Sequence, residues 1–135
     1  MSIATVPRPI VAASRAMAGL ALLVGSALWA TGADPWALWV PLLLAPVVEE
    51  ALFRAGLQDG LLRAGVSPLL ANLVTAASFC MAHVLLVGVT LPTLLVWLPA
   101  LLIGAAYNRW RRLRVCVALH MAMNVAWVSA AQFMP

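Results

Sequence analysis

The stretch PVVEEALFRAGL, residues 46–57, places two adjacent acids and an arginine inside an otherwise apolar segment. Glu50 and Arg54 are four residues apart, so on a helix they share a face and can form an ion pair. Glu49 is rotated by about 100° from Glu50, so its carboxylate can point elsewhere. The spacing therefore predicts one paired acid beside one free acid. The alternative is a purely structural cluster that holds helices together.

The chain around this stretch has the composition of an integral membrane protein. Of its 135 residues, 65% are hydrophobic and 9% are charged, with a mean hydropathy of +1.04. A soluble domain is nearer to half apolar and one quarter charged. The length suits one domain, so we expect a single transmembrane domain over residues 1–135.

Apolar runs of about 20 residues, the length that crosses a bilayer, recur along the chain with turn-forming residues between them. They predict an all-α fold, a polytopic transmembrane helix bundle of about five spans near 13–31, 36–58, 68–88, 91–107 and 115–133. The first run could be a cleaved signal peptide, but its length and the four runs that follow favour an uncleaved helix. Gln58 and Asp59 are interpreted as the membrane exit of the second span.

The basic residues are all arginines, and their positions define a topology. With the N-terminus in the cytoplasm and the C-terminus outside, all eight lie on or near the cytoplasmic side. They are Arg8, Arg15, Arg54, Arg63, Arg109, Arg111, Arg112 and Arg114. This is the positive-inside pattern of membrane proteins. The basic charge is therefore interpreted as a topology signal, and no nucleic-acid partner is expected.

Most polar residues predicted to lie within the spans fall in three short patches. Besides EEALFR, these are FCMAH, residues 79–83, and HMAMN, residues 120–124. Ionisable side chains inside a membrane are costly and are candidates for function by default. At 1.5 Å per residue, the patches lie about 9 to 15 Å from the expected cytoplasmic ends of their helices. We therefore predict a polar site in the cytoplasmic half of the membrane.

These residue types supply the parts of a hydrolytic site. A carboxylate and an imidazole can hold and deprotonate a water molecule. An imidazole and an amide can donate hydrogen bonds to a developing oxyanion, and His120 and Asn124 are four apart on one helix face. Such a set can hydrolyse an amide without a covalent intermediate and without a cofactor.

The three patches also resemble a known family. In order along the chain, they match the EExxxR, FxxxH and HxxxN motifs of the CAAX protease and bacteriocin-processing family. That family is similar to the eukaryotic type II CAAX prenyl endopeptidase and consists of glutamic-type intramembrane proteases. The matching region covers about residues 36–128 and so includes most of the chain.

The resemblance implies a role for each matching residue. Glu49 would be the general base that activates water, with His83 helping to position that water. His120 and Asn124 would form the oxyanion hole, and Glu50 would support the site.

Two further residues would have structural roles by the same resemblance. Arg54 would hold the acids in place, and Phe79 would pack near His83. The implied substrate is a membrane-anchored or lipidated protein or peptide, such as a C-terminal prenylated or sorting-signal segment. The implied location is a bacterial inner membrane. Many family members have additional spans, so the sequence leaves substrate recognition open.

Three other interpretations fit the same residues. Zinc could bind to Glu49, His83 and His120, although no HExxH motif is present. A thiolate–imidazole nucleophile could form from Cys80 and His83 or from Cys116 and His120. Finally, the protein could be a non-catalytic membrane scaffold or an immunity factor that binds another membrane protein.

Overall fold

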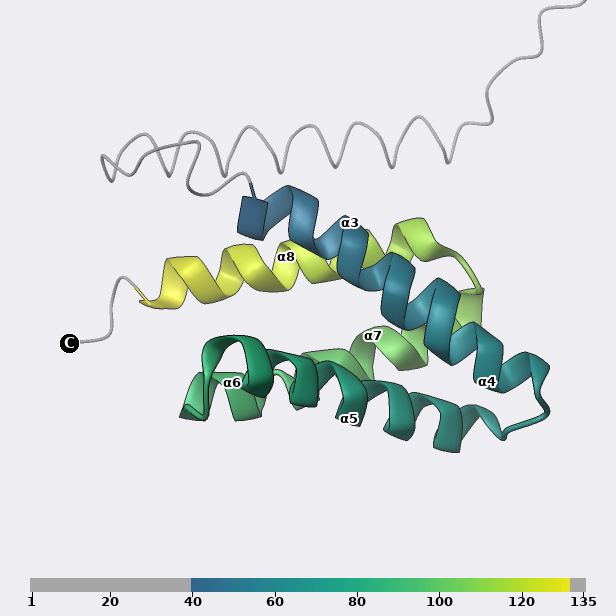
Figure 1. Ribbon diagram of the computed structural model, residues 1–135. Helices are drawn as coiled ribbons and strands as arrows, with labels where there is room; N and C mark the ends of the chain where they lie inside the picture. Colours follow the sequence, from purple (N-terminus) through teal and green to yellow (C-terminus); the bar gives the residue numbers. More distant parts are fainter. Residues whose placement is uncertain (1–39, 132–135) are drawn as a thin grey trace, which may run out of the picture. The chain divides into compact units, whose positions relative to one another are not determined.

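The computed structural model describes residues 40–131, and the regular elements within this range are all helices (Figure 1). A continuous helical stretch, called helix 40–63 below, comprises η1 (Val40–Leu44), α3 (Ala45–Glu50), η2 (Ala51–Gln58) and α4 (Asp59–Arg63). It is followed by α5 (Pro68–Val87), α6 (Leu91–Leu95), α7 (Trp97–Trp110) and α8 (Leu113–Ala131). This confirms the all-α class.

Three helices in the described part of the chain are long and apolar enough to cross a membrane. They are Pro68–Val87, Leu91–Trp110 and Leu113–Ala130, and they correspond to the third, fourth and fifth expected spans. The first expected span, 13–31, lies outside the described residues. The second, 36–58, is helical from Val40 and continues to Arg63, but it is not among the three. Helix 40–63 contains five charged residues, more than a membrane-crossing helix usually has. The protein is therefore a multi-pass membrane protein, with three spans supported by the described residues.

Local sequence signals set the ends of these helices. Ser67 caps α5, its hydroxyl accepting a hydrogen bond from the Leu70 amide, and Pro68 occupies the first turn. Gly88, at a φ of 99°, ends α5 in a conformation that favours glycine. The break at Val96 between α6 and α7 precedes Pro99, which has no amide proton to donate to the preceding turn.

Helix 40–63 and α7 form the centre of the bundle. The η2 segment contacts α5, α7 and α8, and α7 packs along both α5 and α8 (Figure 1). One apolar cluster contains Ala76, Phe79 and Ala100, and a second contains Ile103, Tyr107 and Cys116. The buried polar residues of helix 40–63, Glu50, Arg54 and Gln58, are therefore enclosed by α5, α7 and α8.

Small residues let α5 and α7 approach closely. A Cβ atom added at Gly104 would overlap the side chain of Asn72, with the Asn72 Cγ only 2.7 Å away. Close packing at small residues is characteristic of helices inside membranes. The outward faces carry large apolar side chains, among them Leu85 and Leu86, which suits contact with lipid.

Candidate active site

A buried ion pair lies at the centre of the polar cluster. Arg54 Nε donates to Glu50 Oε2 at 2.9 Å, and both side chains are 0% exposed. This is the pair that the four-residue spacing predicts. The η2 segment that carries Arg54 has wide turns, in which the Asp59 amide donates to the Arg54 carbonyl five residues earlier. Such π-helical turns are frequent at functional sites.

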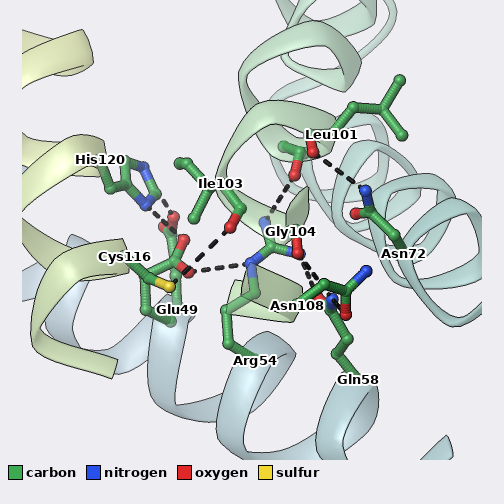
Figure 2. Close-up of polar contacts among 12 residues, drawn as sticks. Glu49, Arg54, Gln58, Asn72, Leu101, Ile103, Gly104, Asn108, Cys116 and His120 are labelled. Carbon is green, nitrogen blue, oxygen red and sulfur yellow. Dashed lines mark hydrogen bonds and ion pairs between the residues drawn. The ribbon is translucent and has the colours of Figure 1, made fainter. Parts of the chain in front are cut away.

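The two adjacent glutamates have different surroundings. The Glu49 side chain is 27% exposed, whereas the Glu50 side chain is fully buried. His120 from α8 connects them (Figure 2): its Nδ1 lies 2.9 Å from Glu50 Oε1, and its Nε2 lies 3.5 Å from Glu49 Oε2. One acid is thus fixed by two partners, and the other remains open on one side.

His83 approaches the cluster from α5. Its Nδ1 lies 3.0 Å from the Phe79 carbonyl oxygen, which can only accept, so Nδ1 carries the proton. Its Nε2 is then left with a lone pair. The rings of His83 and His120 both pack against the Phe79 ring. The structure therefore brings the glutamates and both histidines to one region.

Phe79 lies between the two histidines. Its ring centroid is 4.4 Å from that of His83 and 5.7 Å from that of His120. Phe53 packs edge-on against the same ring at 5.0 Å. Phe79 is 4% exposed, so it forms an apolar wall that limits how either imidazole can rotate.

Asn124 lies one helical turn beyond His120 on α8. Its Nδ2 donates to the Pro41 carbonyl oxygen at 3.0 Å, which ties α8 to η1. Within residues 40–131, the side chain of Asn124 makes no hydrogen bond to either glutamate. A role for Asn124 in an oxyanion hole therefore stays a prediction.

Gln58 is the polar residue whose position the sequence interpretation missed. It was assigned to the membrane exit, but its side chain is fully buried beside Arg54. Arg54 Nη1 donates to Gln58 Oε1 at 3.4 Å, and Arg54 Nη2 donates to the Ala100 carbonyl at 3.2 Å. The signal was present in the sequence, because Glu50, Arg54 and Gln58 recur at intervals of four.

Both cysteine thiols lie within hydrogen-bond distance of backbone carbonyls. Cys80 Sγ is 3.5 Å from the Thr93 carbonyl oxygen, and Cys116 Sγ is 3.9 Å from that of Ile103. Neither thiol hydrogen-bonds to a histidine in the described part of the chain. The same residues contain no group of three or more His, Cys, Asp or Glu side chains arranged to hold a metal ion.

The arrangement can hold and polarise water. A partly exposed carboxylate, Glu49, lies beside two imidazoles, one of which leaves a lone pair on Nε2. The adjoining acid, Glu50, is neutralised by Arg54, so the site does not hold two free negative charges. A base next to hydrogen-bonding groups is the minimum that hydrolysis by activated water needs.

Comparison with known proteins gave one family. The model of the family described as "Type II CAAX prenyl endopeptidase Rce1-like" matches residues 31–126, which include all three sequence patches. Searches of curated proteins and of solved structures returned no significant match.

Proposed function

The chain belongs to the type II CAAX prenyl endopeptidase Rce1-like family, a family of proteases, and from this premise we propose that it is a glutamic-type intramembrane endopeptidase. It would hydrolyse a peptide bond of a membrane-associated substrate. The observation that carries the proposal is the contrast between two neighbours: Glu49 is partly exposed, while Glu50 is buried and paired with Arg54.

Glu49 is the proposed general base. Its carboxylate takes a proton from a water molecule, which then attacks the carbonyl carbon of the scissile bond. His83 helps to position that water through its free Nε2. Glu50 is paired with Arg54 and His120, so it supports the site and does not compete with Glu49 for the proton.

His120 and Asn124 are the proposed donors to the developing oxyanion. A carboxamide nitrogen has two protons, and Asn124 gives one of them to the Pro41 carbonyl. The second is available for a substrate oxygen. This Asn124 donor is fixed before the reaction, and such donors stabilise the charge that develops in the transition state.

The family supports a substrate class, and the arginine pattern supports an orientation in the membrane. We propose a membrane-anchored or lipidated protein or peptide as the substrate, such as a C-terminal prenylated or sorting-signal segment. The proposed location is a bacterial inner membrane, with the N-terminus in the cytoplasm and the C-terminus outside. The arginines at the expected cytoplasmic ends support this orientation.

The first experiment compares peptide termini in the membrane proteome of cells that express the native protein or Glu49→Gln at equal abundance. The proposal predicts that a small set of proteins keeps uncleaved termini in the variant. Arg63→Gln is the matched control, because Arg63 lies on the same helix with a 69% exposed side chain. Unchanged termini in Glu49→Gln, under conditions that require the gene, would favour a scaffold or immunity protein.

The same assay separates the alternative chemistries. A glutamate-and-water mechanism predicts that cleavage persists with a zinc chelator present, whereas zinc dependence predicts that it stops. Likewise, Cys80→Ala and Cys116→Ala should each retain cleavage. Loss of cleavage in either cysteine variant would favour a thiolate nucleophile.

A further inference from the structure

We propose that Gln58 and Asn108 are positioning residues of this site: they hold the Arg54 guanidinium so that Glu50 keeps its second oxygen for His120 Nδ1, which favours the Nδ1–H tautomer of His120. The inference rests on the proposed function for its catalytic meaning. It concerns two side-chain amides outside the three sequence patches. Its physical basis is which atom donates and which accepts in each hydrogen bond between Asn108 and His120 (Figure 2).

The chain of contacts begins at a backbone carbonyl. Asn108 Nδ2 donates to the Pro68 carbonyl oxygen at 2.9 Å. A carbonyl can only accept, so the carboxamide of Asn108 has one orientation, with Oδ1 turned toward Gln58.

Gln58 passes this direction onward. Its Nε2 donates to Asn108 Oδ1 and to the Gly104 carbonyl, each at 2.9 Å, so both amide protons are used. Its Oε1 must then face Arg54, which it does at 3.4 Å from Nη1. The opposite orientation would turn N–H groups toward a guanidinium and leave two acceptors without a donor. Buried polar atoms without partners are costly, so the observed orientation is favoured.

Arg54 connects these amides to Glu50 and His120. With Nη1 on Gln58 and Nη2 on the Ala100 carbonyl, Nε is left to donate to Glu50. The second oxygen of Glu50 then accepts from His120 Nδ1 at 2.9 Å. Because an ionised carboxylate can only accept, His120 in its neutral form carries its proton on Nδ1 where it meets Glu50.

This tautomer has a chemical consequence at Glu49. It leaves a lone pair on His120 Nε2, which lies 3.5 Å from Glu49 Oε2. The pair can share the proton that Glu49 removes from water, and the protonated imidazole then becomes an N–H donor to the oxyanion. Gln58 and Asn108 act on this step only through Arg54 and Glu50, so neither is a catalytic residue.

The tautomer can be read directly, because the chain contains two histidines. Nitrogen NMR of protein with isotope-labelled imidazoles, purified in micelles without a histidine tag, gives one ring signal set for each, and His83→Gln assigns them. We expect the Nδ1–H form for His120 in the native protein. Gln58→Met and Asn108→Leu should each shift His120 toward a mixture of tautomers.

The matched control is Thr75→Val. Thr75 is fully buried, but its hydroxyl has no hydrogen-bond partner among the described residues, so this isosteric change removes a polar group outside the chain of contacts. Its His120 signals should equal those of the native protein. An unchanged His120 tautomer in both Gln58→Met and Asn108→Leu would overturn the inference. Asn108 is only part-buried, which makes Asn108→Leu the variant to use if Gln58→Met does not fold.

Kinetics on a cleaved substrate supply the second readout. Gln58→Met should lower kcat between about 10- and 100-fold, because small misplacements of catalytic groups have effects of that size. KM should change by less than about twofold, since substrate binding is not altered. If the native protein shows no Glu49-dependent cleavage, the proposed function fails, and the NMR result still decides whether the amides set the tautomer.

Discussion

Because Glu49 and Glu50 are consecutive residues of one helix, their side chains point in different directions and have different surroundings. Glu50 points into the bundle, where Arg54 and His120 accompany it, and Glu49 points to a partly open side. Removing one partner of a buried ion pair leaves an uncompensated charge, while removing a partly exposed charge does not. The effects of the two positions on stability and on the proposed catalysis should therefore be separable.

This separation can be measured as a free energy of unfolding. Arg54→Met should lower it by about 3 to 5 kcal/mol, because a carboxylate is left buried without its cation. Glu49→Gln should lower it by less than about 1 kcal/mol, since it leaves that ion pair intact. Titration with sodium dodecyl sulfate in mixed micelles, followed by circular dichroism, gives both values. If both variants lowered the free energy of unfolding equally, the structural role assigned to Glu50 and Arg54 would be contradicted.

The spacing of residues predicted part of this site and missed another part. The Glu50–Arg54 pair follows from an interval of four on a helix, and the convergence of His83 and His120 follows from the resemblance. Gln58 continues the same interval of four, which places it on the face of Glu50 and Arg54, but the interval does not identify its partners on α7. Its partners, Gly104 and Asn108, lie 46 and 50 residues further along the chain. An isolated glutamine near an aspartate is typical of a membrane boundary until those partners are placed.

At the scale of elements, the close packing of α5 against α7 depends on Gly104. The Asn72 side chain lies where a Cβ of Gly104 would be, and Gln58 Oε1 lies 3.1 Å from the same point. Asn72 Nδ2 also donates to the Leu101 carbonyl at 3.0 Å, so this side chain cannot move without losing that bond. Gly104 therefore sets the distance between the two helices.

Gly104→Ala should lower the free energy of unfolding by about 1 to 3 kcal/mol, through overpacking at this contact. Combining it with Asn72→Ala should recover part of the loss, because the second change makes room for the methyl group. Gly60→Ala is the control: nothing lies within 4 Å of its added Cβ, and alanine favours a helix by about 0.5 to 1 kcal/mol. The same detergent titration tests all three variants. Strictly additive losses in the double variant would argue against the contact.

At the scale of the whole molecule, two connections lie at one end of the bundle. Arg111 Nη1 pairs with Asp59 Oδ1 at 3.2 Å, and Asn108 donates to the Pro68 carbonyl at 2.9 Å. The α4–α5 and α7–α8 connections are therefore on the same side, as the arginine pattern predicts. Arg63 also pairs with Asp59, so the charges at this end are partly balanced.

Thiol labelling tests that topology. In a Cys80→Ala/Cys116→Ala background, single cysteines introduced by Ala64→Cys and Arg112→Cys should be protected from a membrane-impermeant maleimide in intact cells. Val89→Cys, at the opposite end of α5, should react. All three positions are exposed in the structure. Labelling of Ala64→Cys and protection of Val89→Cys would invert the proposed orientation, and different behaviour at Ala64 and Arg112 would contradict the fold.

Hydropathy predicted the apolar helices well and the charged one poorly. The three apolar helices in the described part of the chain were expected within a few residues of their observed bounds, because burial in lipid requires a long uninterrupted run. Helix 40–63 continues five residues beyond its expected end, since Gln58 and Asp59 find partners on α7 and after it. Their contacts depend on tertiary structure, which no local pattern encodes.

The long sequence separations within the polar cluster also constrain how the protein is made. Arg54 needs the carbonyl of Ala100, Gln58 needs Gly104 and Asn108, and Glu50 needs His120. A ribosome adds roughly 5 to 20 residues per second, so the 46 residues from Arg54 to Ala100 take about 2 to 10 s to synthesise. Throughout that time the charged residues of helix 40–63 lack their partners on α7 and α8, and it is unfavourable to bury unpaired charges in lipid. The insertion machinery must therefore shelter this segment until α7 and α8 emerge.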